Sequence, residues 1–372
     1  TTPPYLLCWL ALTAVGAVAV PTNPRGTPAE LAGLMHQTGP RALVTHPALE
    51  HLTGGVRDAP GTVVLDVGTL VGDWTGDAPP YDGVLGSTVS PDDLAVLIPT
   101  SGTTGRSKLV MQTHRAYAMA GEGFPFWLEL TSDDRLMTSL PLFHINAPAY
   151  SVMGSLACGA GLVLVPRFSA SGLLDTARRH GATEYNAIGA MLEMLLRQPV
   201  RSDDANNPLR LFYTGPSPTR ERQEEIERRF GLRVVCGYAL SETPYGLVWP
   251  RGSRPFGTLG TPRQHPTLGT VNHARVVADD GGEVGPGSTG ELLLRNPAVT
   301  PGYWQMPEET AQALVDGWLH TGDLVTVDEG GTYTFVGRRK EVLRRRGENL
   351  SPLEVEEVID AHPDVLESAV VG

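Results

Sequence analysis

The stretch from Leu94 to Lys108, LAVLIPTSGTTGRSK, joins an apolar run to a segment rich in hydroxyl and glycine residues. The run Leu94–Ile98 predicts a buried strand, and a helix is expected from about Thr113. The loop between them carries hydroxyls, glycines and Lys108, which could surround phosphate oxygens with O–H groups, backbone N–H groups and a point charge. Its glycines fit neither a Walker A loop nor a Rossmann fingerprint. A flexible surface loop is the alternative interpretation.

Strand-like and helix-like segments alternate from this stretch to Tyr238, which predicts a mainly parallel sheet covered on both faces. We expect Ser217 and Pro218 to be the N-cap and first-turn residues of the last helix in the series. The further predicted strands are 135–140, 162–165, 183–188, 209–214 and 232–236, and the further predicted helices are 147–158, 171–180, one ending at Arg197, and 219–230.

The pattern changes after Pro250, where Gly and Pro turns separate short strands such as ELLLR and TYTFV. A basic segment then precedes a predicted helix over Pro352–Ala361. The sequence therefore predicts an α/β fold with a large N-terminal domain of mainly parallel sheets flanked by helices. We expect α/β core subdomains over 1–250, a β-rich subdomain over 251–337, and the start of a small, mobile α+β C-terminal domain over 338–372.

Composition excludes several classes of protein. With 29 Lys and Arg against 41 Asp and Glu, the net charge of −12 argues against a broad nucleic-acid or anionic-membrane surface. Three cysteines without a CxxC pair argue against a disulfide framework or zinc site and favour a reducing, cytoplasmic compartment. The apolar run Leu6–Val20 is too short to cross a bilayer and predicts a buried helix followed by a strand. Because residues 338–372 are too few to bury a core, we expect the chain to be incomplete at both ends.

A second segment, GYALSET (Gly237–Thr243), follows a predicted sheet strand at the edge where open α/β sheets bind ligands. Tyr238 offers a face for stacking, Ser241 a hydroxyl, and Glu242 a carboxylate suited to Mg²⁺. A serine that caps a helix, followed by a first-turn glutamate, is the alternative interpretation.

A third segment, GWLHTGD (Gly317–Asp323), precedes the basic segment GRRKEVLRRRGEN (Gly337–Asn349). Asp323 after a glycine turn suits a pair of sugar hydroxyls, although such a residue also caps turns. The run Arg344–Arg346 is either a solvated face or a site for an anionic ligand.

In this order, these segments resemble the adenylate-forming (AMP-binding) superfamily of acyl-CoA synthetases, luciferases and peptide-synthetase adenylation domains. The resemblance rests on SGTTGxxK, YxxSE, the stretch GEL…GYW (Gly290–Trp304), TGD and GRxKE, and it covers nearly the whole chain. It implies that a carboxylic acid attacks the α-phosphorus of ATP, that pyrophosphate leaves, and that CoA then accepts the acyl group. The implied cofactors are ATP, Mg²⁺ and CoA as co-substrate.

By resemblance, Tyr238 stacks on adenine, Ser241 contacts the α-phosphate and Glu242 holds Mg²⁺. Asp323 and Arg338 bind the ribose hydroxyls. Lys340 is the hinge of the C-terminal domain, and the adenylation lysine of the family lies further downstream, outside this sequence. The resemblance places the β- and γ-phosphates against Thr100, Ser101, Gly102, Thr103, Thr104, Gly105 and Lys108, and the other side of adenine against Thr214, Gly215, Pro216 and Ser217.

Three residues depart from the family pattern. Ser107 and Leu109 stand where the phosphate loop usually has proline and glycine, and Ala239 replaces a usual glycine after the tyrosine. We expect these changes to affect the conformation of the phosphate loop and the affinity for nucleotide.

The segment PLFHINAP (Pro141–Pro148) bears on the acid that is activated. Amino-acid-activating relatives carry an aspartate where this chain has His144, and without a carboxylate a buried ammonium would be left unpaired. The resemblance is therefore to the acyl-CoA synthetase branch, and RGENLSPLEVE (Arg346–Glu356) looks most like the carnitine-type CoA ligases. His144 is either catalytic or merely packed in the core. The candidate catalytic residues are Lys108, His144, Ser241 and Glu242, and the acyl-pocket candidates are His144, Ile188, Gly189, Ala190, Tyr213 and Tyr245.

Two other functions stay open. A standalone enzyme could load the acyl group onto the pantetheine of a carrier protein, and a non-catalytic homologue could bind nucleotide as a regulator. The presence of Lys108, Glu242 and Asp323 argues against the second. The expected partners are a small carboxylic acid and CoA, with no nucleic acid, no membrane span and a possible homodimer.

Overall fold

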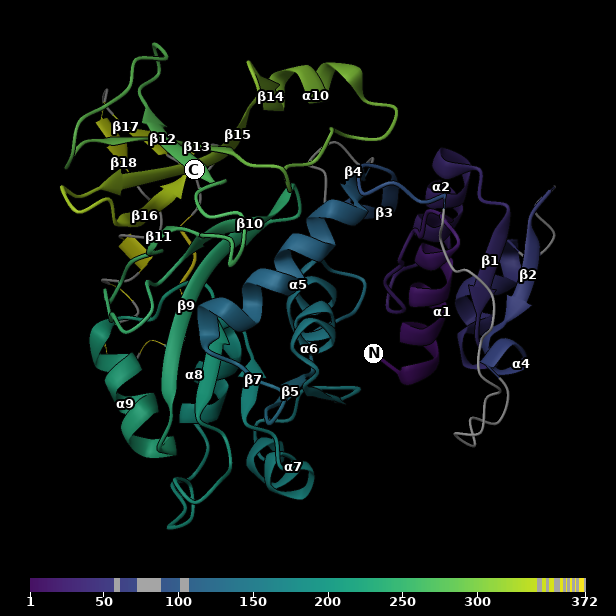
Figure 1. The fold of residues 1–372 in the computed structure, drawn as a ribbon, viewed down its shortest axis with the longest axis horizontal. Helices are drawn as coiled ribbons and strands as arrows, with labels where there is room; N and C mark the ends of the chain where they lie inside the picture. The colour runs from purple at the N-terminus through teal and green to yellow at the C-terminus, as the bar shows by residue number, and fades with distance from the viewer. Residues whose placement is uncertain are drawn as a thin grey trace.

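The computed structural model describes most of the chain, namely residues 1–56, 61–71, 88–100, 107–339, 343–345, 348–350, 355–356, 359, 362, 365 and 368–370. Figure 1 shows the N-terminal helices and strands on the right of the molecule, an antiparallel sheet at the upper left, and a larger sheet with its helices at the lower left and centre. This arrangement is the predicted α/β fold.

The larger sheet has seven strands in the order β11-β10-β9-β8-β7-β5-β6. The five strands from β6 to β9 run parallel, whereas β10 and β11 are antiparallel at the other edge. Every residue of β7 and β8 is buried, so both faces of the sheet are covered, as predicted. The strands are β5 (Arg135–Thr138), β6 (Gly161–Leu164), β7 (Glu184–Asn186), β8 (Leu211–Thr214), β9 (Arg233–Leu240), β10 (Thr243–Val248) and β11 (Thr261–Pro262).

The helices that accompany this sheet follow the predicted alternation. They are α5 (His114–Leu128), α6 (Met153–Cys158), α7 (Leu173–His180), α8 (Gly189–Leu196) and α9 (Arg220–Phe230). The single helix expected over 147–158 is divided, because a π-helical segment, η3 (Ala147–Val152), precedes α6. The N-cap of α9 is Thr219, whose hydroxyl accepts from the backbone N–H of Arg222, so the prediction of Ser217 as the cap was wrong.

The antiparallel sheet has five strands, and it occupies the region expected to be rich in β structure. Its order is β12-β13-β15-β14, with β16 paired to β15. The side chains of Leu292, Leu294 and Val325 are fully buried between its strands and their neighbours. The elements are β12 (His273–Val277), β13 (Thr289–Arg295), α10 (Pro307–Ala313), β14 (Leu314–Val315), β15 (Trp318–Val327) and β16 (Tyr333–Arg338).

The N-terminal region contains the predicted helix and an extended segment that pairs with a strand. Ala19 forms a parallel bridge to Val96, with hydrogen bonds of 2.9 Å to Ala95 and Leu97. The helix α2 begins with a capping box between Thr27 and Glu30. The elements are α1 (Pro3–Ala14), α2 (Pro28–Thr38), β1 (Ala42–Thr45), η1 (Pro47–Leu49), α3 (Glu50–Thr53), η2 (Gly54–Val56), β2 (Val63–Asp66) and α4 (Val67–Val71).

The stretch that begins at Leu94 forms an antiparallel hairpin of β3 (Leu94–Thr100) and β4 (Lys108–Thr113). The strand β4 was not predicted, although Thr113 does cap the helix that follows it. Ser101, Gly102, Thr103, Thr104 and Gly105 lie outside the described residues, as do Lys340 and most of the helix expected over 352–361. A further hairpin consists of β17 (Leu343–Arg345) and β18 (Glu348–Leu350). In the described part of the chain, no helix combines the length and the apolar character that a membrane span requires.

Candidate active site

The second and third sequence segments meet at the junction of the two large sheets. The hydroxyl of Tyr238, on β9, donates to Oδ2 of Asp323, on β15, at 2.5 Å across 85 residues of sequence. Asp323 is 1% exposed, and its Oδ1 lies 3.1 Å from Nε of Arg338, which is its register partner on β16. Burial, together with the Asp323 carboxylate, raises the pKa of Tyr238 well above its usual value. The phenol therefore stays protonated and acts as a donor.

The turn that carries Asp323 is held by Glu291 of β13, a residue to which sequence reasoning gave no role. Gly322 has a φ of +72° and donates its backbone N–H to Oε1 of Glu291 at 3.0 Å. Oε2 of the same carboxylate lies 3.1 Å from Nδ1 of His320 and accepts from Nη1 of Arg339 at 3.0 Å. A charged residue in the apolar strand ELLLR was the one signal that could have identified Glu291.

Ser241 and Glu242 form the turn between β9 and β10. Because a strand follows them rather than a helix, the interpretation of Ser241 as a helix cap was wrong. The backbone carbonyl of Ser241 accepts from Nε2 of Gln112 on β4 at 2.5 Å, and the carbonyl of Glu242 accepts from the N–H of Thr300 at 2.7 Å. Oε1 of Glu242 accepts from the hydroxyl of Tyr303 at 2.8 Å. The turn is thus anchored to two other segments of the chain.

Lys108 lies beside this turn, at the first position of β4. It is opposite Thr100 in the hairpin, and the hydroxyl of Thr100 donates to its carbonyl at 3.3 Å. Its Nζ lies 4.8 Å from the centroid of the Tyr303 ring. Of the predicted phosphate-loop residues, the structure therefore describes only the two that flank the loop.

The turn Thr214–Ser217 follows β8 and lies against the strand that carries Tyr238. A side chain on Gly215 would bring its Cβ within 2.5 Å of the carbonyl oxygen of Gly237. A Cβ on Gly237 would in turn clash with Oη of Tyr213 and Nη2 of Arg263. Glycine at both positions allows the approach that places this turn beside Tyr238.

The six acyl-pocket candidates differ in their surroundings. Ile188, Ala190 and His144 are exposed, and Gly189 lies near Pro216 of the turn after β8. Although His144 is exposed by its accessible surface, neighbouring groups partly desolvate its ring, which lowers its pKa below the usual value and leaves the ring neutral near pH 7. The other two candidates are packed in the core: Tyr213 contacts Phe124 and Tyr150, and Tyr245 contacts Trp127 and His265.

A buried cation lies among these core aromatics. Arg263 is 1% exposed, and its guanidinium lies 4.4 Å from the ring centroid of Trp127 and 4.8 Å from that of Tyr150. It donates to the hydroxyls of Tyr150 and Tyr213 and to the carbonyls of Pro244 and Leu247. Since these bonds use most of its five donors, Arg263 fixes Tyr213 beneath the turn.

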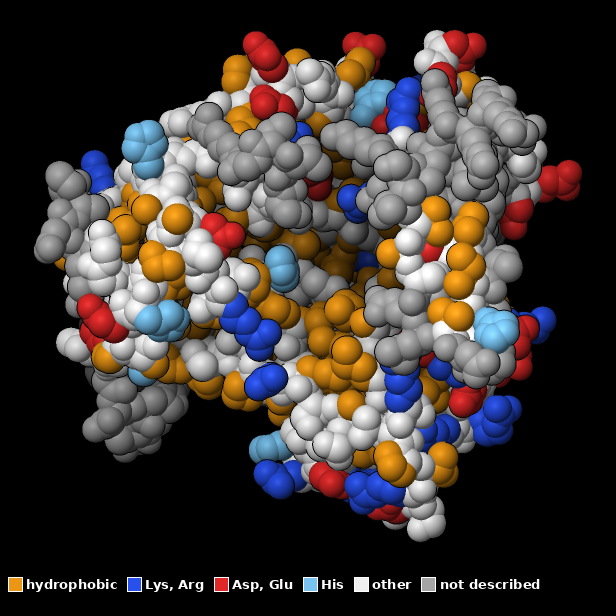
Figure 2. Space-filling view, turned by 180° about the vertical axis from the view of Figure 1, so that it is seen from behind, with side chains coloured by type: hydrophobic (Ala, Val, Ile, Leu, Met, Phe, Trp, Pro, Cys, Tyr) orange, Lys and Arg blue, Asp and Glu red, His pale blue; other side chains and the backbone are white. Residues whose placement is uncertain are grey.

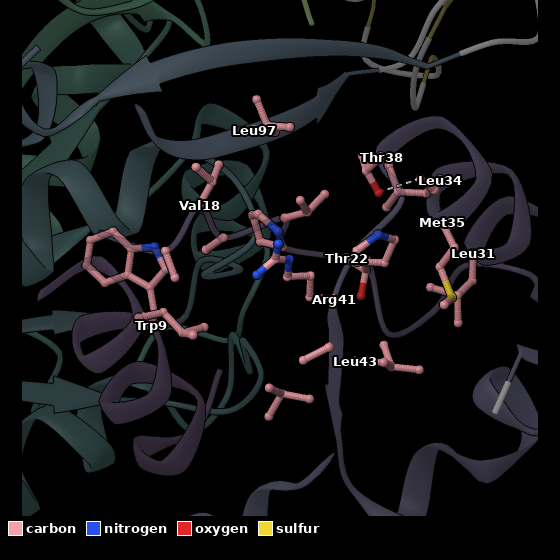
Figure 3. Close-up of a pocket in the computed structure, with 18 of the residues that line it drawn as sticks. Trp9, Val18, Thr22, Leu31, Leu34, Met35, Thr38, Arg41, Leu43 and Leu97 are labelled. Atoms are coloured by element: carbon pink, nitrogen blue, oxygen red, sulfur yellow. Dashed lines mark hydrogen bonds between the residues drawn. The ribbon is translucent and has the colours of Figure 1, made fainter. Parts of the chain in front are cut away.

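The structure also has a pocket of about 590 Å³ that contains none of the predicted site residues. Figure 3 shows Trp9 of α1 on one side of this pocket, Leu31 and Met35 of α2 on the other, and Arg41 between them. Seen from behind, the molecule is hollowed near its centre, with hydrophobic side chains on the walls of the hollow (Figure 2). This pocket is therefore separate from the contacts that join the sequence motifs.

Residues 1–304 match the AMP-binding enzyme family. The chain belongs to this family. The crotonobetaine/carnitine–CoA ligase of Salmonella typhimurium is 32% identical over 394 aligned positions, which cover all of this chain and 74% of that protein. The resemblance inferred from the motifs is confirmed.

Two solved structures of nucleotide-bound proteins have the same fold. ATP-bound MatB from Rhodopseudomonas palustris matches with a TM-score of 0.88 at 28% identity, covering 100% of this chain and 74% of that one. The o-succinylbenzoate CoA synthetase MenE from Bacillus subtilis, in complex with ATP and a magnesium ion, matches with a TM-score of 0.85 at 26% identity, covering 100% and 75%. The predicted fold class is confirmed.

Proposed function

We propose that this AMP-binding enzyme is an acyl-CoA synthetase that activates a carboxylic acid with ATP and transfers the acyl group to CoA. In the first step a carboxylate oxygen of the acid attacks the α-phosphorus of ATP, and the bond to the bridging oxygen breaks as pyrophosphate leaves. In the second step the thiol of CoA attacks the acyl carbonyl, loses its proton and releases AMP. The bond between Tyr238 and Asp323 carries the proposal, because it brings two nucleotide motifs from separate sheets into contact.

Each motif supplies one part of the proposed nucleotide site. Adenine stacks on Tyr238, with Thr214–Ser217 on its other side, and the ribose hydroxyls bind Asp323 and Arg338. Asp323 suits this role because its carboxylate is held by Tyr238 and Arg338 before the ligand arrives. Ser241 contacts the α-phosphate. The phosphate chain then extends toward Lys108, and catalysis consists mainly of positioning and charge neutralisation.

Glu242 is the proposed ligand of Mg²⁺. Among the described residues, the one hydrogen bond to its carboxylate uses Oε1, which leaves Oε2 available as a ligand. No cluster of three or more His, Cys, Asp or Glu side chains suited to a metal occurs in the described part of the chain. Both observations fit Mg²⁺, which typically uses one or two carboxylates together with substrate phosphates. The ion would supply charge stabilisation at the phosphates.

The proposed substrate is a carboxylic acid without an α-ammonium group. His144 occupies the position where an ammonium would need a carboxylate, and its lowered pKa leaves the ring neutral. The crotonobetaine/carnitine–CoA ligase relative and the branch motifs support CoA as the acceptor. The acyl pocket is proposed to include His144, Ile188, Gly189 and Ala190, with Tyr213 and Tyr245 as its packed wall.

We further propose the domain division at about 250 and 338, with Lys340 as the hinge, a cytoplasmic location and homodimerisation as features of this protein. The three cysteines are free, which is compatible with a reducing compartment.

The test, run on a chain that extends to the expected downstream lysine, is acid-dependent pyrophosphate exchange with a panel of simple carboxylic acids and amino acids. Thioester formation with free CoA or with a holo-carrier protein is then measured. We expect exchange with simple acids and thioester formation with CoA. Faster exchange with amino acids would contradict the proposed acid class. Thioester formation with the carrier protein alone would show that the carrier, and not CoA, is the acceptor. Nucleotide binding without exchange for any acid would favour the non-catalytic homologue.

A further inference from the structure

Tyr303 connects the two charged side chains that the proposed function assigns to the phosphates and the metal. Its hydroxyl donates to Oε1 of Glu242 at 2.8 Å, and Nζ of Lys108 lies over its ring, 4.8 Å from the centroid. We propose that Tyr303 is a positioning residue that orients the Glu242 carboxylate for Mg²⁺ and keeps Lys108 from neutralising it. This inference rests on the proposed function.

The backbone around Tyr303 holds the phenol in place. Tyr303 forms an antiparallel bridge with Val110 of β4, flanked by hydrogen bonds from Met111 to Gly302 at 3.0 Å and from Trp304 to Leu109 at 2.9 Å. Its own N–H donates to the hydroxyl of Thr310 at 2.9 Å. The segment is thus held against β4 of the β3–β4 hairpin by an isolated bridge. Because Lys108 begins β4, the lysine and the tyrosine belong to one framework.

The phenol is nearly buried and bonded to a carboxylate. Tyr303 is 8% exposed, and its hydroxyl donates to Oε1 of Glu242 at 2.8 Å. A hydrogen bond to a charged acceptor is among the strong ones. This bond restrains Oε1, and no described residue forms a hydrogen bond with Oε2.

The ring keeps the two charges apart. In the described part of the chain, no carboxylate forms an ion pair with Lys108, whose ammonium lies on the Tyr303 ring instead. A cation–π contact at a partly exposed site is weak, so an incoming phosphate can draw the ammonium away. A direct pair between Lys108 and Glu242 would have to be broken before either side chain could bind its part of the ligand.

The experiment measures ATP binding by calorimetry at a series of Mg²⁺ concentrations, in the wild type and in Tyr303→Phe. The substitution keeps the ring and removes the hydroxyl. Residues that support a metal ligand typically contribute tenfold or more to metal affinity, so we expect the half-saturating Mg²⁺ concentration to rise about tenfold. ATP binding without Mg²⁺ should change less than twofold, because the phenylalanine ring still contacts the ammonium of Lys108. Tyr303→Leu, which also removes the ring, should alter the metal-free binding as well.

Tyr185→Phe is the matched control, since the Tyr185 hydroxyl is fully buried and bonded to Ser139 at 2.5 Å in the central sheet. Thermal melting shows that each variant is folded, and the control should keep the wild-type response to Mg²⁺. The double variant Tyr303→Phe, Glu242→Gln should respond like Glu242→Gln alone, because Tyr303 acts through Glu242.

An unchanged Mg²⁺ response in Tyr303→Phe, alongside a raised requirement in Glu242→Gln, would overturn the inference and leave the metal assignment intact. If Glu242→Gln itself binds ATP with a wild-type response to Mg²⁺, the assignment of Glu242 fails instead. Additive effects in the double variant would show that the two residues act independently and would also overturn the inference.

Discussion

The two ends of the proposed nucleotide site are built differently. At the ribose end, Asp323 is buried and is already bonded to Tyr238 and Arg338, so protein contacts define its position. At the phosphate end, the ammonium of Lys108 lies over the ring of Tyr303, and Glu242 accepts one hydrogen bond, from the hydroxyl of the same tyrosine. The ribose end is therefore preformed, whereas the phosphate end keeps its charges available.

This difference has a consequence for catalysis. Contacts to ribose are the same in the ground state and the transition state, so they contribute to binding ATP rather than to the chemical step. Charge on the phosphates changes during the reaction, so groups at the phosphate end stabilise the transition state preferentially. Substitutions at the ribose end should therefore change mainly the KM for ATP, whereas substitutions at the phosphate end should change mainly kcat.

Glu242→Gln should have the largest effect. The amide keeps the shape of the side chain but removes the charge that places Mg²⁺, which we expect to cost on the order of 3 kcal/mol, or somewhat over a hundredfold in kcat/KM. Acid-dependent pyrophosphate exchange, in a chain that extends to the expected downstream lysine, measures the loss, with circular dichroism as the control for folding. Exchange near the wild-type rate would remove Glu242 from the metal site and would erase the contrast between the two ends.

Asp323→Ala should have a smaller effect, and it should fall on KM. The loss of a charged acceptor for the ribose hydroxyls costs about 1.5–3 kcal/mol, which raises the KM for ATP roughly tenfold to a hundredfold. The kcat should change much less. Part of the cost reflects the Tyr238 hydroxyl, which is left without its acceptor. Steady-state kinetics with varied ATP checks the prediction, and an unchanged KM for ATP would exclude Asp323 from the site.

His144→Asp should have the smallest effect on nucleotide binding, because His144 belongs to neither end of the proposed nucleotide site. The new carboxylate supplies the counter-charge that an ammonium requires, so we expect measurable binding of amino acids and weaker binding of the native acid. The KM for ATP should stay within about twofold of the wild type, as for a surface substitution away from the nucleotide. A panel of acids in the exchange assay reads out both effects. A large rise in the KM for ATP would show that the acid and nucleotide regions are coupled.

Much of the fold followed from periodicity in the sequence. Apolar runs of four to six residues between helical patterns predicted the strands of the central sheet, because parallel strands are buried on both faces. The strand β4 was missed because its apolar run, Leu109–Met111, is only three residues long and lies between Lys108 and Gln112. The cap of α9 was misplaced by two residues because Ser217, Pro218 and Thr219 all suit a helix start.

The candidate site was only partly predictable. The motifs identified Tyr238, Glu242 and Asp323 as candidates, but no local pattern reveals that Tyr303 reaches Glu242 across 61 residues of sequence. The role of Glu291 likewise depends on the register of β13 against β15. Such contacts arise from strand pairing, which the periodicity of a single segment does not specify.

The most direct test of the account is a crystal structure of the protein with ATP and Mg²⁺. The account predicts adenine against the ring of Tyr238, ribose hydroxyls within hydrogen-bonding distance of the Asp323 carboxylate, and the triphosphate between Lys108 and Glu242. ATP bound elsewhere, for example in the pocket between Trp9 and Met35, with the junction of the two sheets empty, would contradict it.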